Sequence, residues 1–170
     1  MPEPQKVFLV GMMGAGKTTV GRRLAQRLGR PYLDNDEEVV RATGRTVPEI
    51  MEADGVAAYR VEEKQALVRG ATSEGPLVVS VGGGVVLDPD NRKCMRDNGV
   101  VVWLRARIET MVERVGRGEG RPLLGDDPEA AMRRLYPERE PLYAEVADIT
   151  VDVDDLTPDQ VADRIVAALS

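Results

Sequence analysis

The feature that most constrains this chain is a glycine-rich segment that lies between an apolar run and an amphipathic stretch. The segment Gly11–Thr18 reads Gly-Met-Met-Gly-Ala-Gly-Lys-Thr and fits the phosphate-loop pattern G-x-x-x-x-G-K-[ST]. The run Val7–Val10 predicts a buried strand before it, and hydrophobic spacing predicts a helix over Lys17–Leu28 after it. In such a unit, backbone amides and the positive end of a helix dipole face a bound phosphate. We therefore expect an α/β fold that binds a phosphorylated ligand.

Strands and helices alternate along the rest of the sequence. Pro31–Leu33 predicts a short second strand, while Leu77–Val81 and Val100–Leu104 are continuous apolar runs typical of strands covered on both faces. Ile149–Val153 predicts the last strand. A capping box over Thr157–Gln160 then opens a final amphipathic helix. This alternation predicts an α/β fold with a parallel sheet.

Three helical stretches separate the second and third predicted strands. They cover Glu37–Thr43, Val47–Ala53 and Ala57–Ala71, and glycine-containing turns interrupt them. The chain shows no internal repeat, low-complexity tract or linker. We therefore predict one domain over residues 1–170, with a helical insertion at about 35–72.

Composition excludes several classes of chemistry. The chain has no histidine and a single cysteine, Cys94. A Ser-His-Asp triad, an imidazole base, histidine metal ligation and a cysteine-cluster zinc site are therefore impossible. Acid-base chemistry is left to carboxylates, lysine and tyrosine, and the natural metal is a hard cation held by oxygens.

Charge and hydropathy limit the partners of the chain. The formal net charge of −6 argues against a general binding surface for nucleic acid or anionic lipid. No apolar run approaches the roughly 18 residues that span a bilayer. We therefore predict a cytoplasmic protein whose partners are small molecules, without nucleic-acid or membrane partners.

The phosphate loop gives roles to two of its side chains. Lys17 is expected to bridge the β and γ phosphates of ATP, and Thr18 to ligate the accompanying Mg²⁺. The alternative is a strand-to-helix turn that is rich in glycine without binding a phosphate.

Two carboxylates follow the second predicted strand. Asp34 and Asp36 should lie beside the phosphate loop, because the carboxyl ends of parallel strands meet at one edge of a sheet. One of them can hold a water of the Mg²⁺ while the other orients or deprotonates the attacking hydroxyl. The alternative for Asp36 is a role as the N-cap of the next helix.

Glycines and arginines further along the chain indicate a site for an anionic acceptor. Gly82–Gly84 follow the third predicted strand, and consecutive glycines let a ligand approach the bare backbone. Arg60 and Arg139 lie on separate predicted helices, and guanidinium groups hold carboxylates in a bidentate manner. Arg121 lies among hinge-like glycines, as in a lid that closes over phosphates. Surface solvation is the alternative for each arginine.

The order of these features resembles that of the shikimate kinase family, within the nucleoside-monophosphate-kinase-like group of phosphate-loop proteins. The resemblance covers nearly the whole chain. The motifs that carry it are Gly11–Thr18, Gly21–Ala25, Asp34–Asp36, Thr43-Gly44, Tyr59–Glu63, Gly82–Gly84, Arg121–Leu124 and Arg139–Tyr143.

The resemblance implies a fold and a reaction. The implied fold is a P-loop three-layer α/β/α arrangement around a five-stranded parallel sheet of order 2-3-1-4-5. Residues 35–72 are then the substrate-binding insertion, and residues 114–126 are a mobile lid. The implied reaction is the phosphorylation of the 3-hydroxyl of shikimate by ATP and Mg²⁺, in the chorismate and aromatic amino-acid pathway. We predict that the chain is a monomer.

The resemblance also implies the roles of individual residues. Asp36 is the catalytic base, Lys17 and the lid residue Arg121 neutralise the transferring phosphoryl group, and Arg114 lies against adenine. The ATP-binding residues are Gly14, Ala15, Gly16, Lys17, Thr18, Thr19, Arg114 and Arg121. The substrate-binding residues are Asp36, Arg60, Gly82, Gly83, Gly84 and Arg139, and the metal-binding residues are Thr18 and Asp34.

The chain departs from the family pattern at a few positions. Met51 and Tyr59 replace phenylalanines that usually line the acid pocket, and Val56 replaces a glutamate near the substrate helices. The segment Asp154–Leu156 replaces a basic residue that some members place against the adenine edge. Acceptor selectivity and adenine selectivity therefore stay open.

Two other functions also stay open on sequence alone. A gluconate-kinase-like enzyme would share the phosphate loop, although Gly82–Gly84 together with Arg60 and Arg139 favour a rigid ring acid. A catalytically silent nucleotide-binding relative is the second alternative, and such a protein would not need Asp36 as a base.

Overall fold

The computed structural model describes residues 6–115 and 127–170 of the chain. The strands are β1 (Lys6–Val10), β2 (Tyr32–Asp34), β3 (Leu77–Ser80), β4 (Val100–Arg105) and β5 (Ile149–Asp152). The helices are α1 (Lys17–Leu28), α2 (Asn35–Thr43), α3 (Val47–Asp54), α4 (Val56–Thr72), α5 (Pro89–Asn98), α6 (Ile108–Val115), α7 (Pro128–Val146) and α8 (Pro158–Leu169), and a 3₁₀ turn, η1, covers Val85–Leu87.

The strands form one parallel sheet in the order β2-β3-β1-β4-β5, which confirms the predicted order. Leu9 of β1 pairs with Ser80 of β3, and Ser80 pairs with Asp34 of β2. The carboxyl ends of these three strands therefore meet at one edge of the sheet. The phosphate loop follows β1 at this edge, Asp34 ends β2 there with Asp36 just beyond it, and the three glycines follow β3.

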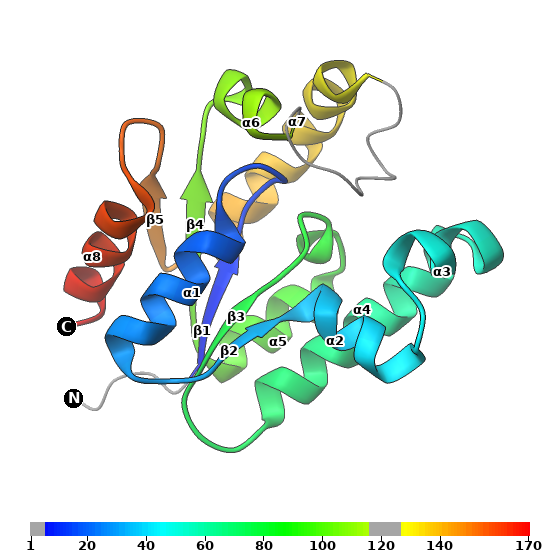
Figure 1. Ribbon diagram of the computed structural model, residues 1–170, viewed down its shortest axis with the longest axis horizontal. Helices are drawn as coiled ribbons and strands as arrows, with labels where there is room; N and C mark the ends of the chain where they lie inside the picture. The colour runs from blue at the N-terminus through cyan, green and yellow to red at the C-terminus, as the bar shows by residue number, and fades with distance from the viewer. Residues whose placement is uncertain (1–5, 116–126) are drawn as a thin grey trace.

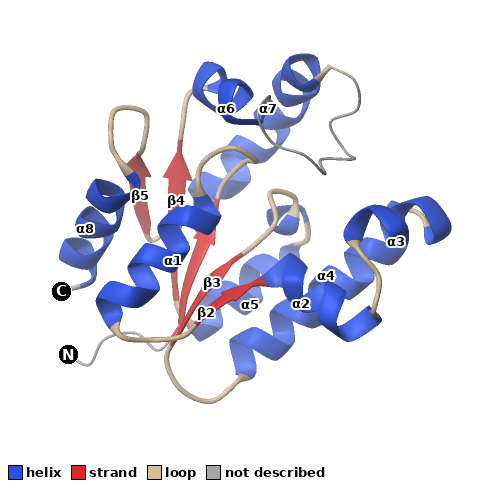
Figure 2. Ribbon diagram, in the orientation of Figure 1, coloured by secondary structure: helices blue, strands red, loops and turns tan. Residues whose placement is uncertain are grey.

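Helices cover the two faces of the sheet, which gives the predicted three layers (Figures 1 and 2). Helices α1 and α8 pack against each other in front of the sheet, and α5 and α7 lie behind it. The central strand β1 is buried at every position, as the apolar run Val7–Val10 requires, and the buried Lys6 donates to the carbonyl oxygen of Ser73. Burial on both faces fixes the position of β1, and with it the start of the phosphate loop.

Local sequence signals explain where several helices begin and end. Thr46 starts α3 and Thr157 starts α8, each through a capping box in which threonine accepts from the third backbone amide of the helix. Gly29 ends α1 in a left-handed conformation that glycine adopts without strain. The predicted helix over Lys17–Leu28 is confirmed at both ends.

Other elements differ from the prediction or were not predicted. Strand β2 begins at Tyr32, one residue after the predicted start, and helices α5 and α6 were not predicted. Helix α7 continues through Pro137 and Pro141, each of which removes one backbone hydrogen bond. Prolines are unfavourable inside helices, so the sequence did not predict the bounds of α7. Arg139 lies on this helix, as predicted.

The predicted insertion at 35–72 corresponds to the helices α2, α3 and α4, which leave the sheet between β2 and β3 (Figure 1). Most of the predicted lid, including Arg121, lies outside the described residues, whereas Arg114 lies on α6. Within residues 6–115 and 127–170, no helix combines the length and apolar character needed to cross a membrane.

Candidate active site

The phosphate loop connects β1 to α1 and owes its shape to glycine. Gly14 and Gly16 have φ angles of +84° and +95°, which are strained for residues with a Cβ atom. The ammonium of Lys17 donates to the carbonyl oxygens of Gly11 at 2.6 Å and Met12 at 3.0 Å. Ser80 Oγ donates to the carbonyl oxygen of Lys17 at 3.0 Å and so joins β3 to the first turn of α1. The lysine is therefore held at the inner face of the loop.

Asp34 uses its two carboxylate oxygens differently. Oδ1 accepts from the backbone amides of Asp36 at 2.9 Å and Glu37 at 3.2 Å, so Asp34 is the N-cap of α2. Oδ2 lies 3.5 Å from Oγ1 of Thr18 in α1. The alternative N-cap role for Asp36 is wrong, because Asp36 already lies inside the first turn of the helix.

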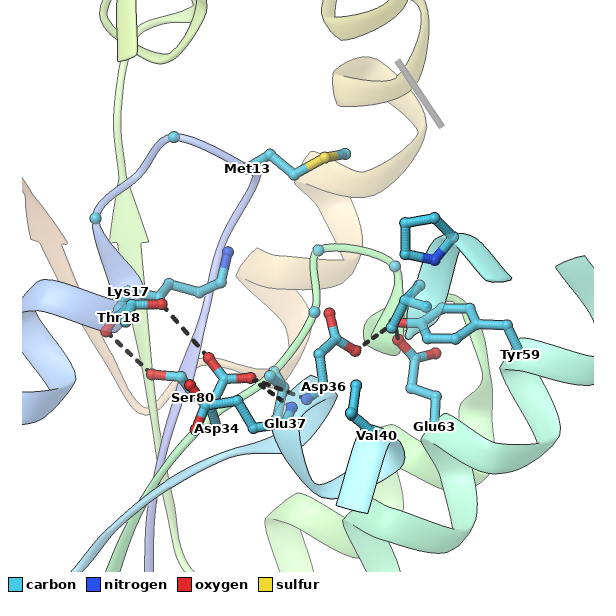
Figure 3. Close-up of a pocket in the computed structure, with 18 of the residues that line it drawn as sticks. Met13, Lys17, Thr18, Asp34, Asp36, Glu37, Val40, Tyr59, Glu63 and Ser80 are labelled. Carbon is cyan, nitrogen blue, oxygen red and sulfur yellow. Dashed lines mark hydrogen bonds between the residues drawn. The ribbon is translucent and has the colours of Figure 1, made fainter. Parts of the chain in front are cut away.

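Asp36 projects from α2 toward α4 (Figure 3). Its Oδ1 accepts a hydrogen bond of 2.6 Å from the hydroxyl of Tyr59. Burial raises the pKa of the Asp36 carboxyl and the nearby Asp34 adds to the rise, while Tyr59, Lys17 and Arg60 oppose it. A carboxylate with a raised pKa is a stronger base, as proton abstraction from an alcohol requires.

The three glycines after β3 make room for charged side chains. Gly82, Gly83 and Gly84 have ordinary φ angles, so their turn does not itself demand glycine. A Cβ atom at Gly83 would lie 3.3 Å from Nη1 of Arg139, and one at Gly84 would overlap the guanidinium of Arg60. These two arginines thus approach the bare backbone of this loop, while the approach of a ligand stays a prediction.

Arg60 and Arg139 therefore lie side by side over neighbouring residues of one loop. Arg139 is only 3% exposed, and its Nε has no hydrogen-bond partner among the described residues. Arg60 is partly exposed, pairs with Glu63 at 2.8 Å and stacks over the ring of Tyr59. Guanidinium groups bind planar anions such as carboxylates in a bidentate manner, so this pair of arginines has the chemistry that the sequence prediction requires.

One cavity of about 560 Å³ brings most of these groups together. The predicted site residues that line it are Gly14, Gly16, Lys17, Thr18, Thr19, Asp34, Asp36, Arg60, Gly82, Gly83, Gly84, Arg114 and Arg139. Ala15 does not line this cavity, and Arg121 lies outside the described residues. The volume is in the usual range for a small-molecule site.

A second cavity of about 200 Å³ adjoins the phosphate loop on the side of α8. Gly16, Thr19 and Arg114 line both cavities, and Ala15, Val153 and Leu156 contribute to the walls of the second. Arg114 Nη1 donates to the carbonyl oxygen of Gly14 at 3.2 Å. Asp154, in contrast, accepts from the Arg107 amide and the Thr110 hydroxyl at the start of α6.

Some residues that line the larger cavity had no predicted role, and Glu63 is one of them. Glu63 lies one turn after Tyr59 on α4, and its carboxylate accepts from both Tyr59 and Arg60. Glu63 follows Arg60 by three residues and Tyr59 by four, and this spacing on a helix indicates that the side chains can interact. Of the positions that depart from the family pattern, Met51 and Tyr59 line the larger cavity, whereas Val56 does not and is 43% exposed.

The residues present fit a hard divalent cation. Thr18 Oγ1 and Asp34 Oδ2 lie close together at the wall of the cavity, next to the phosphate loop. Within the described residues, no group of three or more acidic, histidine or cysteine side chains is gathered for a metal. Two protein oxygens suit Mg²⁺ in particular, because this ion keeps several waters and takes further oxygens from phosphates.

Comparison with known proteins adds independent information. The family model for shikimate kinase matches residues 13–170. The shikimate kinase of Ruegeria pomeroyi is 47% identical over 166 residues, which are 96% of this chain and 84% of that protein. The shikimate kinase of Stenotrophomonas maltophilia strain K279a is 44% identical over 170 residues, which are 99% of this chain and 93% of that protein.

Solved structures show the same likeness. The shikimate kinase from Acinetobacter baumannii, in complex with shikimate, superposes with a TM-score of 0.94 at 39% identity over 98% of this chain and 93% of that one. The shikimate kinase from Aquifex aeolicus superposes with a TM-score of 0.81 at 32% identity over 96% of this chain and 95% of that one. On sequence and structure alike, the chain belongs to the shikimate kinase family.

Proposed function

We propose that this chain transfers the γ-phosphoryl group of ATP to the 3-hydroxyl of shikimate. The observation that carries the proposal is the convergence of Arg60 and Arg139 on neighbouring glycines, in the cavity that also contains Lys17 and Asp36. One part of this cavity suits a polyphosphate and another suits a carboxylate. Asp36 lies between Lys17 and helix α4, where an acceptor hydroxyl would meet the phosphate (Figure 3).

The side chains divide the reaction among them. Asp36 takes the proton of the acceptor hydroxyl, and the oxygen then forms a bond to the γ phosphorus. The bond from this phosphorus to the bridging oxygen breaks, and its electron pair stays on ADP. Lys17 stabilises the negative charge on the phosphoryl oxygens, and Arg121 is predicted to assist from the lid. Arg60 and Arg139 hold the carboxylate of the acceptor.

Thr18 and Asp34 would hold Mg²⁺, Thr18 directly and Asp34 through a coordinated water. When bound, the ion neutralises charge on the β and γ phosphates. The position of Asp34 supports this role, because its Oδ2 faces Thr18 while Oδ1 is occupied at the end of α2.

The second cavity is the proposed site of adenine. Its wall combines the apolar side chains of Val153 and Leu156 with the guanidinium of Arg114, which suits the flat ring of a base. Asp154 is not among the residues that line this cavity, because its carboxylate accepts from the Arg107 amide and the Thr110 hydroxyl at the start of α6.

The enzyme is proposed to act as a monomer. Size-exclusion chromatography with light scattering tests the oligomeric state. The cytoplasmic location stays a prediction from the sequence.

An ADP-release assay with shikimate, quinate and gluconate as acceptors tests the proposed function. We expect release to depend on shikimate and to be weaker with quinate and gluconate. Release that depends only on gluconate would favour the related sugar-acid kinase. If nucleotide binds but no acceptor stimulates release, the chain is a catalytically silent relative.

A further inference from the structure

The hydroxyl of Tyr59 lies between two carboxylates that contribute to the walls of the cavity. It is 2.6 Å from Oδ1 of Asp36 and 2.8 Å from Oε2 of Glu63 (Figure 3). A phenol has a single proton, so it cannot donate to both acceptors at the same moment. The tyrosine is only 4% exposed, and water has little access to either bond. The two carboxylates therefore share one donor.

This arrangement leaves the two oxygens of Asp36 unequal. Oδ1 is occupied by Tyr59, while Oδ2 lies 3.8 Å from the position that a Cβ atom would take on Gly82. The χ2 angle of aspartate is broadly distributed, so a carboxylate without such a bond samples many orientations. The hydrogen bond to Oδ1 thus keeps Oδ2 turned toward the glycine loop.

Glu63 connects the hydroxyl of Tyr59 to the guanidinium of Arg60. Its Oε2 accepts from Tyr59, and its Oε1 accepts from Nη1 of Arg60 at 2.8 Å. One buried carboxylate thereby connects the side chain that orients Asp36 with the side chain proposed to hold the acceptor carboxylate. The connection runs entirely through α4, whose helical spacing brings Tyr59, Arg60 and Glu63 to one side.

We propose that Tyr59 is a positioning residue that acts through Asp36. Its hydroxyl donates to Oδ1 so that Oδ2 points at the attacking hydroxyl of the acceptor, and Glu63 is the competing acceptor of the same proton. This inference rests on the proposed function and deepens it. The hydroxyl of Tyr59 is engaged by two protein acceptors, so its effect is on turnover and not on acceptor binding.

The decisive variant is Tyr59→Phe, which keeps the buried ring and removes only the oxygen. We expect kcat to fall by about tenfold, because a reacting group that is no longer held in place reacts more slowly. KM for shikimate should stay within about twofold, because Arg60 and Glu63 remain paired. A role confined to folding would instead lower the melting temperature and leave kcat per folded molecule unchanged.

The control is Tyr136→Phe, which removes a tyrosine hydroxyl beside another carboxylate, Glu140, away from the cavity. Its kcat and KM should equal those of the wild type. A second variant, Glu63→Gln, replaces the charged acceptor that competes with Asp36 for the proton of Tyr59 by a weaker neutral one, and it also weakens the bond to Arg60. Glu63→Gln should therefore raise KM for shikimate and keep kcat within about threefold.

Three outcomes would overturn the inference: Tyr59→Phe retaining full kcat, Tyr59→Phe changing chiefly KM, or Glu63→Gln losing as much kcat as Tyr59→Phe. Measuring shikimate turnover by the wild-type protein distinguishes a failure of this inference from a failure of the proposed function. Absence of shikimate turnover by the wild type would contradict the function itself, whereas the ratio of Tyr59→Phe to wild type tests the role of the tyrosine.

Discussion

Thr18 Oγ1 and Asp34 Oδ2 lie 3.5 Å apart, across the junction between the first turn of α1 and the end of β2. The other oxygen of Asp34 accepts two backbone amides at the start of α2. A single carboxylate thus fixes the direction of the insertion helices and also faces the hydroxyl that is proposed to ligate Mg²⁺. Oδ1 is occupied at the start of α2 and Oδ2 faces Thr18, which supports the proposal that Asp36 is the base.

The first prediction concerns Asp34→Asn. Asparagine is an equally good N-cap, so α2 should keep its start and the protein should stay folded. The amide is a weaker partner for a metal-bound water, so the Mg²⁺ concentration that gives half-maximal activity should rise several-fold. A titration of activity against Mg²⁺ measures the shift. Activity that stays low at saturating Mg²⁺ would contradict a role limited to the metal.

The second prediction concerns Lys17→Ala. Its ammonium is held at the inner face of the phosphate loop, where the γ phosphate is proposed to lie. Removal of this charge should lower kcat by a factor on the order of 10² to 10³, as for other donors that stabilise a transition state. Lys93→Ala is the control, because Lys93 is an exposed lysine that pairs with Asp97 outside the cavity. Turnover of Lys17→Ala near that of the control would disprove the phosphate-loop assignment.

The third prediction concerns the glycines that underlie the arginines. Gly84→Ala would put a methyl group into the guanidinium of Arg60, whereas Gly83→Ala would bring one to 3.3 Å from Arg139. We expect KM for shikimate to rise about tenfold or more in Gly84→Ala and less in Gly83→Ala, with little change in KM for ATP. Steady-state kinetics with each substrate measures both values. Equal effects on the two substrates would indicate a general distortion of the site.

Much of the fold could be predicted because its signals are local. The apolar run of β1 and the glycine-rich loop that follows are adjacent in sequence, and so are Thr157 and the helix that it caps. The sheet order came from the family resemblance, not from the strands themselves. Helix α7 was hard to delimit because Pro137 and Pro141 interrupt its pattern.

The contacts within the site were harder to foresee. Tyr59 meets Asp36 across 23 positions of sequence, and only the packing of α4 against α2 brings them together. Sequence alone does not say which of Glu62 and Glu63 faces the cavity, since the two are adjacent on a helix. Nor does it say that Asp34, and not Asp36, caps α2, because both residues are good caps.

The fourth prediction concerns the contact between α1 and α8. Asp159 of α8 accepts from Arg23 and Arg27 of α1, each at 3.1 Å, and these bonds, that of Arg27 foremost, hold the pKa of Asp159 below its ordinary value. Because its pKa is lowered on folding, the Asp159 carboxylate raises the free energy of unfolding at pH values above its unfolded-state pKa. This contribution is lost as pH falls. Asp159→Asn should therefore lower the melting temperature by a few degrees at most at neutral pH, since exposed pairs are weak. The difference should begin to shrink as pH falls below about 4 and should vanish only below the lowered pKa of the folded state. A difference that is constant with pH would contradict this origin.

The last prediction concerns Asp36→Asn and completes the contrast with Asp34. Asparagine fills the same space and can still accept from Tyr59, so MgATP binding and folding should be preserved. An amide cannot take the proton of the acceptor hydroxyl, and kcat should therefore fall by a factor of about 10² to 10⁴. Excess Mg²⁺ should not restore it, because the defect lies in proton transfer and not in metal binding.

Two titrations of activity against Mg²⁺, one for each variant, separate the roles of the two aspartates. Asp34→Asn should approach wild-type activity as Mg²⁺ rises, while Asp36→Asn should stay inactive across the range. The opposite pattern would exchange the two assignments. It would require Asp36, whose Oδ1 is bound by Tyr59, to serve the metal, and Asp34, whose Oδ1 caps α2, to serve as the base. The geometry disfavours that exchange, because Oδ2 of Asp36 is turned toward Gly82, whereas Oδ2 of Asp34 faces Thr18.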